Sequence, residues 1–389
     1  MPHPLRTAHP QNQRTLKTEE PLKRTGLTND ELQKIFPKIF EWTNGESSPT
    51  LKQAQELAKR ARIPFGRLLL KEPTGEDMGV TDFRTVKNIG IEDVSPDLQE
   101  VISSAQSRLA WYSEYALDVG IKAPPLLGIV AEEDPVAAVA VKVRELLDLE
   151  LSKPLSGPDK VRTLVVKMED AGILVSRNSI VGSSTKRKLS VDEFRGFTLT
   201  EDGYCLVFVN TRDAKTAQLF SLAHELGHVV LGKPGISDHS DQLKVERWCN
   251  RFAAEFLAPP SAVNEWFDPE ESILTSVENL AKKFGMSREA ILWRLVELQF
   301  ITRESASRVV AVIKQKGYDE ENEKGTDGTP PPYILVRSRV GSRFFETVSH
   351  AAETGYLPDR EAARYLGAAS YHSFEKLLQS RSQPRREVI

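Results

Sequence analysis

Residues 220–232 read FSLAHELGHVVLG, and this stretch decides the fold because it places the pattern H-E-x-x-H inside an apolar run that favours a helix. Residues four apart lie on the same face of an α-helix, so His224 and His228 can both bind one zinc ion. Glu225 projects beside that position, where a carboxylate can take a proton from zinc-bound water. The alternative interpretation is two hydrogen-bonded histidines on a core helix. We favour the zinc site because the neighbouring sequence completes the helix.

The residues around the motif indicate where this helix begins and ends. Asn210 or Asp213 can cap its first turn, and Gly232, followed by Pro234, ends it. Apolar residues recur between these two signals, at Ala217, Phe220, Ala223 and Val230. The spacing therefore predicts a helix with one packed face and the two histidines in its second half.

A catalytic zinc ion takes three protein ligands and keeps its fourth position for water. The downstream segment VERWCNRFAAEFLAPP, residues 245–260, places Glu246 and Asn250 on one face of a second predicted helix. We predict that this helix delivers Glu246 to the metal. Asn250 would then hold the free ring nitrogen of a ligating histidine.

Other side chains compete with Glu246 for the third ligand position. The candidates are His239, Glu255, Cys205 and Cys249. His239 falls in the loop sequence GISDHSD and Glu255 on a different helix face, while lone cysteines are more often buried apolar residues. The longer pattern H-x-x-G-x-x-H does not apply, because Leu231 stands where its glycine is required. Glu246 is therefore the favoured ligand.

Five segments between residues 161 and 302 carry a resemblance to a known family. They are DEFRGFTL (192–199), LVFVN (206–210), LFSLAHELGHVVLG (219–232), VERWCNRFAAEFLAP (245–259) and FGMSREAILWRL (284–295). Together they resemble the ImmA/IrrE family of bacterial zinc metallo-endopeptidases. The resemblance implies a gluzincin-like peptidase with one zinc ion per chain, held by His224, His228 and Glu246, and with Glu225 as the general base.

The same resemblance implies a biological context. It is regulatory proteolysis of a protein substrate, commonly a helix-turn-helix repressor or antitoxin encoded beside the protease. The gene then sometimes lies in a toxin–antitoxin, mobile-element or stress-response operon. The alternative function is a DNA- or protein-binding regulator of such an operon, in which the zinc site is structural or inactive.

The composition bounds the class of protein. The chain has 389 residues, of which 40% are hydrophobic and 28% charged, and a net charge of −3, which predicts an ordinary soluble protein with room for two or three domains. Two cysteines cannot build a disulfide framework, no apolar run approaches the ~20 residues of a membrane helix, and no signal-peptide core is present. We expect a cytoplasmic protein with no membrane partner.

The predicted fold class is α+β and mostly helical: a zincin-like peptidase domain with a small β-sheet beside the H-E-x-x-H helix, flanked by helical N-terminal and C-terminal domains. Strands are predicted at residues 173–176, 194–200 and 204–210, and YILVRSRV (333–340) is also strand-like. The predicted divisions are a disordered tail (1–26), a degenerate helix-turn-helix-like domain (27–75), a helical connecting region (76–155), the peptidase domain (156–316), an acidic linker (317–332) and a small basic, mainly helical domain (333–389).

Three parts of the chain raise the question of DNA binding. Between Leu27 and Trp42 there is too little room for two helices and a DNA-recognition helix, and Pro37 interrupts this segment. We therefore favour a structural role for the helix-turn-helix-like domain at residues 27–75. Residues 276–302 predict helix, turn and helix, with Arg288 and Arg294 as phosphate partners, although their apolar residues resemble core. Residues 333–389 hold nine basic and six acidic side chains, an excess that also fits a solvated surface. DNA binding is therefore weakly supported.

The expected chemistry is peptide hydrolysis by direct addition of water. Zinc lowers the pKa of its bound water towards ~7, and Glu225 removes the proton and passes it to the leaving amine. His239, Tyr204 and Arg195 are the open candidates for stabilising the oxyanion. An edge strand carrying Arg195 and Gly196 could bind an extended substrate as an added strand.

Overall fold

The computed structural model describes residues 29–44, 46–61, 95–233, 239–322, 332–368 and 370–379. The chain divides into two compact units, Met1–Val80 and Thr81–Ile389. The tail predicted over residues 1–26 lies outside the described residues. No helix within the described part of the chain is long and apolar enough to cross a membrane.

The first unit contains three short helices, α2 (Asn29–Ile35), α3 (Ile39–Thr43) and α4 (Leu51–Ala61). Pro37 lies in the turn between α2 and α3, where its ring excludes a continuous helix. The start of α4 is a capping box: the Thr50 backbone N–H donates to the Gln53 side chain, and the Gln53 N–H donates to the Thr50 hydroxyl. A small apolar cluster joins the helices, made of Phe36, Ile39, Trp42, Ala54, Leu57 and Ala58.

The second unit is built on a sheet of three strands, β1 (Leu174–Asn178), β2 (Gly196–Glu201) and β3 (Tyr204–Asn210). The order is β1-β3-β2, with β1 parallel and β2 antiparallel to β3. Asp202 and Gly203 join β2 to β3 with φ of 49° and 83°, as a tight hairpin requires. The three strands predicted from the sequence are confirmed.

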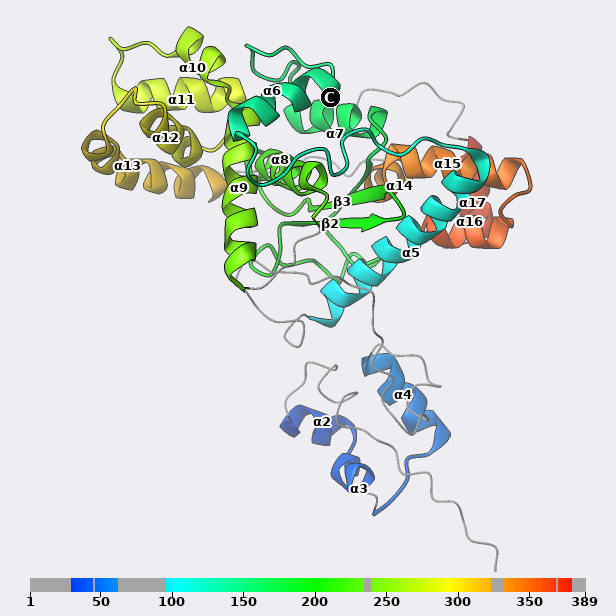
Figure 1. Cartoon of the computed structure of the whole chain (residues 1–389). Coiled ribbons are helices and arrows are strands. Elements are labelled where there is room, and N and C mark those ends of the chain that lie inside the picture. The colour runs from blue at the N-terminus through cyan, green and yellow to red at the C-terminus, as the bar shows by residue number, and fades with distance from the viewer. Residues whose placement is uncertain are drawn as a thin grey trace, which may run out of the picture. The chain divides into compact units, whose positions relative to one another are not determined.

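Different helices cover the two faces of this sheet (Figure 1). Alternate residues of β3 point to opposite faces. Val207 and Val209 belong to the main hydrophobic core together with α8 (Lys215–Leu231). Tyr204, on the other face, meets the ring of Tyr112 edge-on at 5.7 Å, and Tyr112 lies on α5 (Pro96–Val119). The sheet is therefore the middle layer of the unit.

Further helices enclose α8 and carry the chain beyond the sheet. They are α6 (Val136–Leu146), α7 (Lys160–Asp170), α9 (His239–Leu257), α10 (Pro260–Trp266), α11 (Ile273–Phe284), α12 (Arg288–Glu297) and α13 (Arg303–Asn322). The α11–α12 pair is the predicted helix, turn and helix, with Gly285 at φ 70° and Ser287 accepting the Ala290 N–H. Arg294, proposed above as a phosphate partner, is instead buried in ion pairs with Glu255 and Glu297.

The C-terminal region forms α14 (Pro332–Val340), α15 (Ser342–Glu353), α16 (Asp359–Tyr365) and α17 (Tyr371–Gln379). The strand predicted for residues 333–340 is wrong, since this segment is the helix α14. Its branched apolar residues favour a strand locally, but packing against β1 overrides that preference. The predicted start of the linker at residue 317 is also wrong, because α13 continues to Asn322. Gly317 lowers helix propensity without ending the helix.

Gly341 generates a prediction about how the C-terminal helices attach to the sheet. Its φ is 89°, and a Cβ there would lie 2.6 Å from the Val175 carbonyl oxygen. Gly355 has a similar φ of 75° with nothing within 4 Å of an added Cβ. We expect Gly355→Ala to cost about 1 kcal/mol of unfolding free energy, and Gly341→Ala about 3 kcal/mol, because only the second also forces α15 away from β1. Urea denaturation measures both, and equal losses would contradict this packing.

Candidate metal centre

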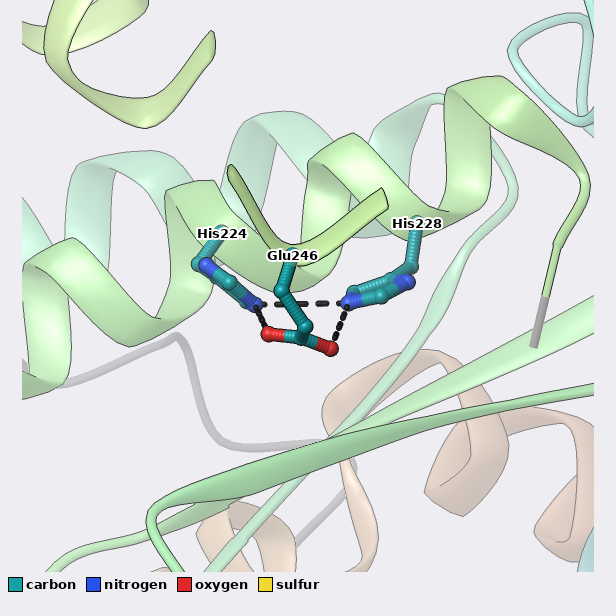
Figure 2. A group of neighbouring side chains, drawn as sticks. All are labelled: His224, His228 and Glu246. Atoms are coloured by element: carbon teal, nitrogen blue, oxygen red, sulfur yellow. Dashed lines mark hydrogen bonds and ion pairs between the residues drawn. The ribbon is translucent and has the colours of Figure 1, made fainter. Parts of the chain in front are cut away.

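Two imidazoles of α8 face the same point in space (Figure 2). His224 and His228 are one helical turn apart, and their Nε2 atoms lie 3.3 Å from each other. Both side chains are largely shielded, since the HELGH segment packs between the sheet and α9. The helix ends one turn later at Gly232, with φ of 62°, as the sequence predicts.

The carboxylate of Glu246 reaches this point from α9. Its Oε2 lies 3.2 Å from His224 Nε2 and its Oε1 lies 3.4 Å from His228 Nε2. The three side chains offer ligand atoms that all lie within 4.8 Å of one another. The Glu246 side chain is 38% exposed, so the cluster opens to solvent on the Glu246 side.

Hydrogen bonds at the outer ring nitrogens orient the two imidazoles. His228 Nδ1 lies 3.3 Å from the backbone carbonyl of Lys233, which can only accept, so Nδ1 carries the proton. His224 Nδ1 lies 3.0 Å from Asn250 Oδ1, the contact that the helix spacing of Glu246 and Asn250 predicts. When the rings are neutral, both Nε2 lone pairs therefore point into the cluster, as metal binding requires.

Charges within the cluster favour an ionised Glu246. Burial alone would raise the pKa of this carboxyl, but hydrogen bonds from His224 and His228 hold it well below its usual range. Burial lowers the pKa of His228, yet contacts with Cys249 and Glu246 raise it well above the ordinary histidine value. The donor set is thus a carboxylate between two imidazoles, which suits a divalent cation.

A glycine lets α8 and α9 approach closely enough for this geometry. A Cβ on Gly227 would lie 3.1 Å from Cys249 Sγ and 3.3 Å from its Cα. Gly227 lies in the helical turn between the two histidines, and Cys249 lies one turn after Glu246. The contact therefore sets the separation of the two helices where the three polar side chains meet.

Glu225 points from α8 towards the sheet rather than towards α9. Its carboxylate is held by the Thr198 hydroxyl, which donates to Glu225 Oε2 at 2.7 Å. A Cβ on Gly196 would lie 3.0 Å from Glu225 Oε1, so β2 must carry a glycine there. Both Glu225 and Thr198 are 7% exposed. Glu225 is therefore a buried carboxylate in a defined orientation beside the cluster.

Several residues weighed from the sequence lie elsewhere. Glu255 is paired with Arg294 and takes no part in the cluster. The Tyr204 hydroxyl donates to the Ile121 carbonyl on the far face of the sheet, and Arg195 pairs with Asp213. His239 begins α9 instead of lying in a loop, and its side chain is outside the described residues.

Two further expectations concern the cysteines and the start of α8. Cys205 and Cys249 are both buried, and neither belongs to the ligand cluster among the described residues. The predicted helix cap is wrong, because α8 begins after Ala214 without a side-chain cap. The Asn210 side-chain amide instead donates from Nδ2 to the Phe194 carbonyl and accepts the Arg212 N–H at Oδ1.

The sequence reasoning missed Thr198 and Gly227 as parts of this site, and it placed Gly196 on a substrate-binding edge without predicting its contact with Glu225. Thr198 offers a weak signal, as a polar residue between Phe197 and Leu199 on a predicted strand. It faces α8 because side chains alternate along a strand. No local pattern indicates that Gly227 and Cys249 touch, since they belong to separate helices.

The arrangement is that of a zincin-like metallopeptidase domain: two histidines of one helix, a carboxylate from the next, and a buried glutamate beside a small sheet. Residues 168–296 match a peptidase family model described as the IrrE N-terminal-like domain. The matched range runs from the end of α7 to the end of α12. The ImmA/IrrE resemblance is thereby confirmed for this part of the chain. Curated proteins gave no significant sequence match.

Gly227 generates a prediction about metal binding. Gly227→Ala places a methyl group against Cys249, so α9 must move by a few tenths of an ångström and carry Glu246 with it. We expect zinc affinity to fall at least about tenfold, measured by competition with a chromophoric chelator. Gly120→Ala is the control: its φ of 74° makes alanine strained, but an added Cβ there meets nothing within 4 Å, so zinc affinity should stay unchanged even if stability falls.

A second variant tests the cause of that loss. Adding Cys249→Ala to Gly227→Ala removes the sulfur contact and should recover part of the affinity. Wild-type affinity in Gly227→Ala would show that the helix separation does not control the site.

Proposed function

We propose that this protein is a zinc-dependent endopeptidase in which His224, His228 and Glu246 hold one zinc ion and Glu225 is the general base. The convergence of two Nε2 lone pairs and an ionised carboxylate within 4.8 Å carries this proposal. Two nitrogen ligands and one oxygen ligand suit zinc and leave a position for water or substrate. The peptidase family match supports the same reaction class.

Glu225, Thr198 and Asn250 have separate roles in the proposed hydrolysis. When bound, zinc supplies a Lewis acid that polarises the peptide carbonyl and acidifies water. Glu225 accepts the proton of the attacking water on its carboxylate and delivers it to the leaving nitrogen. Thr198 occupies Oε2 and so leaves Oε1 for that proton. Asn250 keeps the His224 ring in its binding orientation.

The proposed substrate is a protein, and specifically a helix-turn-helix repressor or antitoxin. Strand β2 supports a protein substrate, since it forms an edge of the sheet and carries the residues that hold Glu225. An extended peptide added to this edge would be bound by main-chain hydrogen bonds, which depend little on the amino-acid sequence of the peptide. The ImmA/IrrE resemblance implies a repressor as substrate, and selectivity for it would then rest on surfaces away from the scissile bond.

Glu225→Gln tests the proposed chemistry. The amide keeps the shape of the side chain but cannot accept the proton, so cleavage should fall about 10²–10⁴-fold while zinc content stays near one per chain. Cleavage is followed on the proposed substrate, a helix-turn-helix repressor or antitoxin, with zinc measured by elemental analysis. His224→Ala is the contrasting variant, because it should lose both zinc and cleavage.

The same variant separates the peptidase from the alternative regulator. A DNA- or protein-binding regulator with a structural zinc site predicts full activity in Glu225→Gln and salt-sensitive binding to DNA. A Glu225→Gln protein that still cleaves would rule out the proposed role of this carboxylate.

Thr198 generates a prediction about positioning. Thr198→Val removes the hydroxyl that donates to Glu225 and leaves a side chain of similar shape, so kcat should fall about 10–100-fold with KM and zinc content unchanged. Thr198→Ser keeps the hydroxyl and should restore most of the rate. Equal rates for the valine and serine variants would mean that the hydroxyl does not position Glu225.

A further inference from the structure

A cavity of about 500 Å³ is lined by residues of α5 and α16. Figure 1 labels these two helices. The wall of the cavity includes two arginines, two aromatic rings and two serines, namely Arg108, Arg364, Trp111, Tyr365, Ser104 and Ser107, besides Ala110 and Glu114. This size is typical of cavities that hold a small-molecule ligand. The wall combines cationic groups with flat apolar surface.

Arg108 is the unusual member of this wall. Its Nε is shielded from solvent and has no hydrogen-bond partner, and the side chain forms no ion pair among the described residues. Glu114 also lines the cavity but pairs with neither arginine there. Burial lowers the pKa of the Arg108 guanidinium to about 10, which still leaves it charged at neutral pH. The side chain as a whole is half-buried and lines the cavity, so what costs free energy is the shielded Nε donor that has no acceptor.

Arg144 and Arg294 are almost completely buried, whereas Arg108 is half-buried, and they show how the chain satisfies a structural arginine. Arg144 donates to the backbone carbonyls of Glu150, Lys153 and Phe256. Arg294 is paired with two glutamates.

Two more arginines have an Nε without a hydrogen-bond partner, and each has carboxylates nearby. Asp159 and Glu169 act on Arg177, and Glu346 pairs with Arg337. Arg108 alone in this described group has no carboxylate partner, so the fold does not supply its counter-ion.

The rest of the wall indicates what kind of anion would supply that charge. Trp111 and Tyr365 lie 5.4 Å apart, and Tyr115 and Phe344 hold the Trp111 ring in place. A rigid aromatic surface next to a guanidinium suits a ligand that has both a flat ring and a negative charge. The Arg364 side chain adds a second positive charge at the exposed rim.

We propose that this cavity binds a nucleoside phosphate, with its phosphate on the Arg108 guanidinium and its base against Trp111 and Tyr365. Ser104 is an exposed hydroxyl donor at the same wall, whereas the Ser107 hydroxyl already donates to the Ser103 carbonyl. The proposal does not depend on the peptidase activity, because no residue of the cavity belongs to the metal centre.

Calorimetric titration of the full chain tests the proposal with defined probes. AMP, GMP, CMP and UMP are titrated separately, with adenosine and inorganic phosphate as the two halves of the ligand. We expect at least one nucleotide to bind with a Kd below about 100 µM, and at least about tenfold more tightly than either half. Failure of all four nucleotides to bind, or phosphate binding as tightly as they do, would overturn the proposal.

Matched arginine variants identify the site and guard against misfolding. Arg108→Met should weaken nucleotide binding about 10–100-fold, yet leave the ligand-free Tm unchanged or raised, because it removes a charge without a partner. Arg144→Met should lower the Tm, because it leaves the carbonyls of Glu150, Lys153 and Phe256 without their donor, and the Phe256 contact is buried. Nucleotide binding that survives Arg108→Met, or a Tm loss matching that of Arg144→Met, would show that Arg108 is structural.

Discussion

The close contact between Gly227 and Cys249 is the constraint on which the metal centre depends. It brings α8 and α9 together one turn away from Glu246, so a side chain of ordinary length can reach both imidazoles. Successive residues of a helix are about 100° apart, which turns Glu225 away from His224 and towards the sheet. Helix α8 thus carries the two histidine ligands on the side that faces α9, and the proton acceptor Glu225 on the side that faces β2.

That geometry brings polar and charged side chains together in a buried region, where an unpaired charge is costly in free energy. Glu225, His228 and Thr198 are buried, and the surrounding side chains of α8 and α9 are apolar. Each polar group therefore needs a partner, and each has one: a hydroxyl for Glu225, a carbonyl for His228 and two imidazoles for Glu246. The partners also fix direction. The hydrogen bonds that satisfy the cluster leave its ligand atoms aimed at a common centre.

Local periodicity was enough to predict the cluster, and distant contacts account for the failures. His224, His228, Glu246 and Asn250 follow from spacing within two helices, and the three strands follow from their local residue pattern. The sequence could not show that Arg294 forms an ion pair with Glu255, or that Tyr204 faces α5. The strand predicted for residues 333–340 is wrong for the same reason, because packing against β1 outweighs the local strand preference of these residues. Gly227 and Thr198 matter only through residues that are remote in sequence.

The family match also understates the extent of the folding unit. It covers residues 168–296, but α5 and α15 complete the packing around the sheet from outside that range. Arg343 of α15 donates to the Tyr112 hydroxyl of α5 and to the Glu169 carbonyl, and Ser176 of β1 donates to the Val340 carbonyl. Removing these segments would leave one face of the sheet uncovered, with Tyr204 and its apolar neighbours in water. The sheet that holds Glu225 therefore depends on helices that precede and follow the peptidase motif.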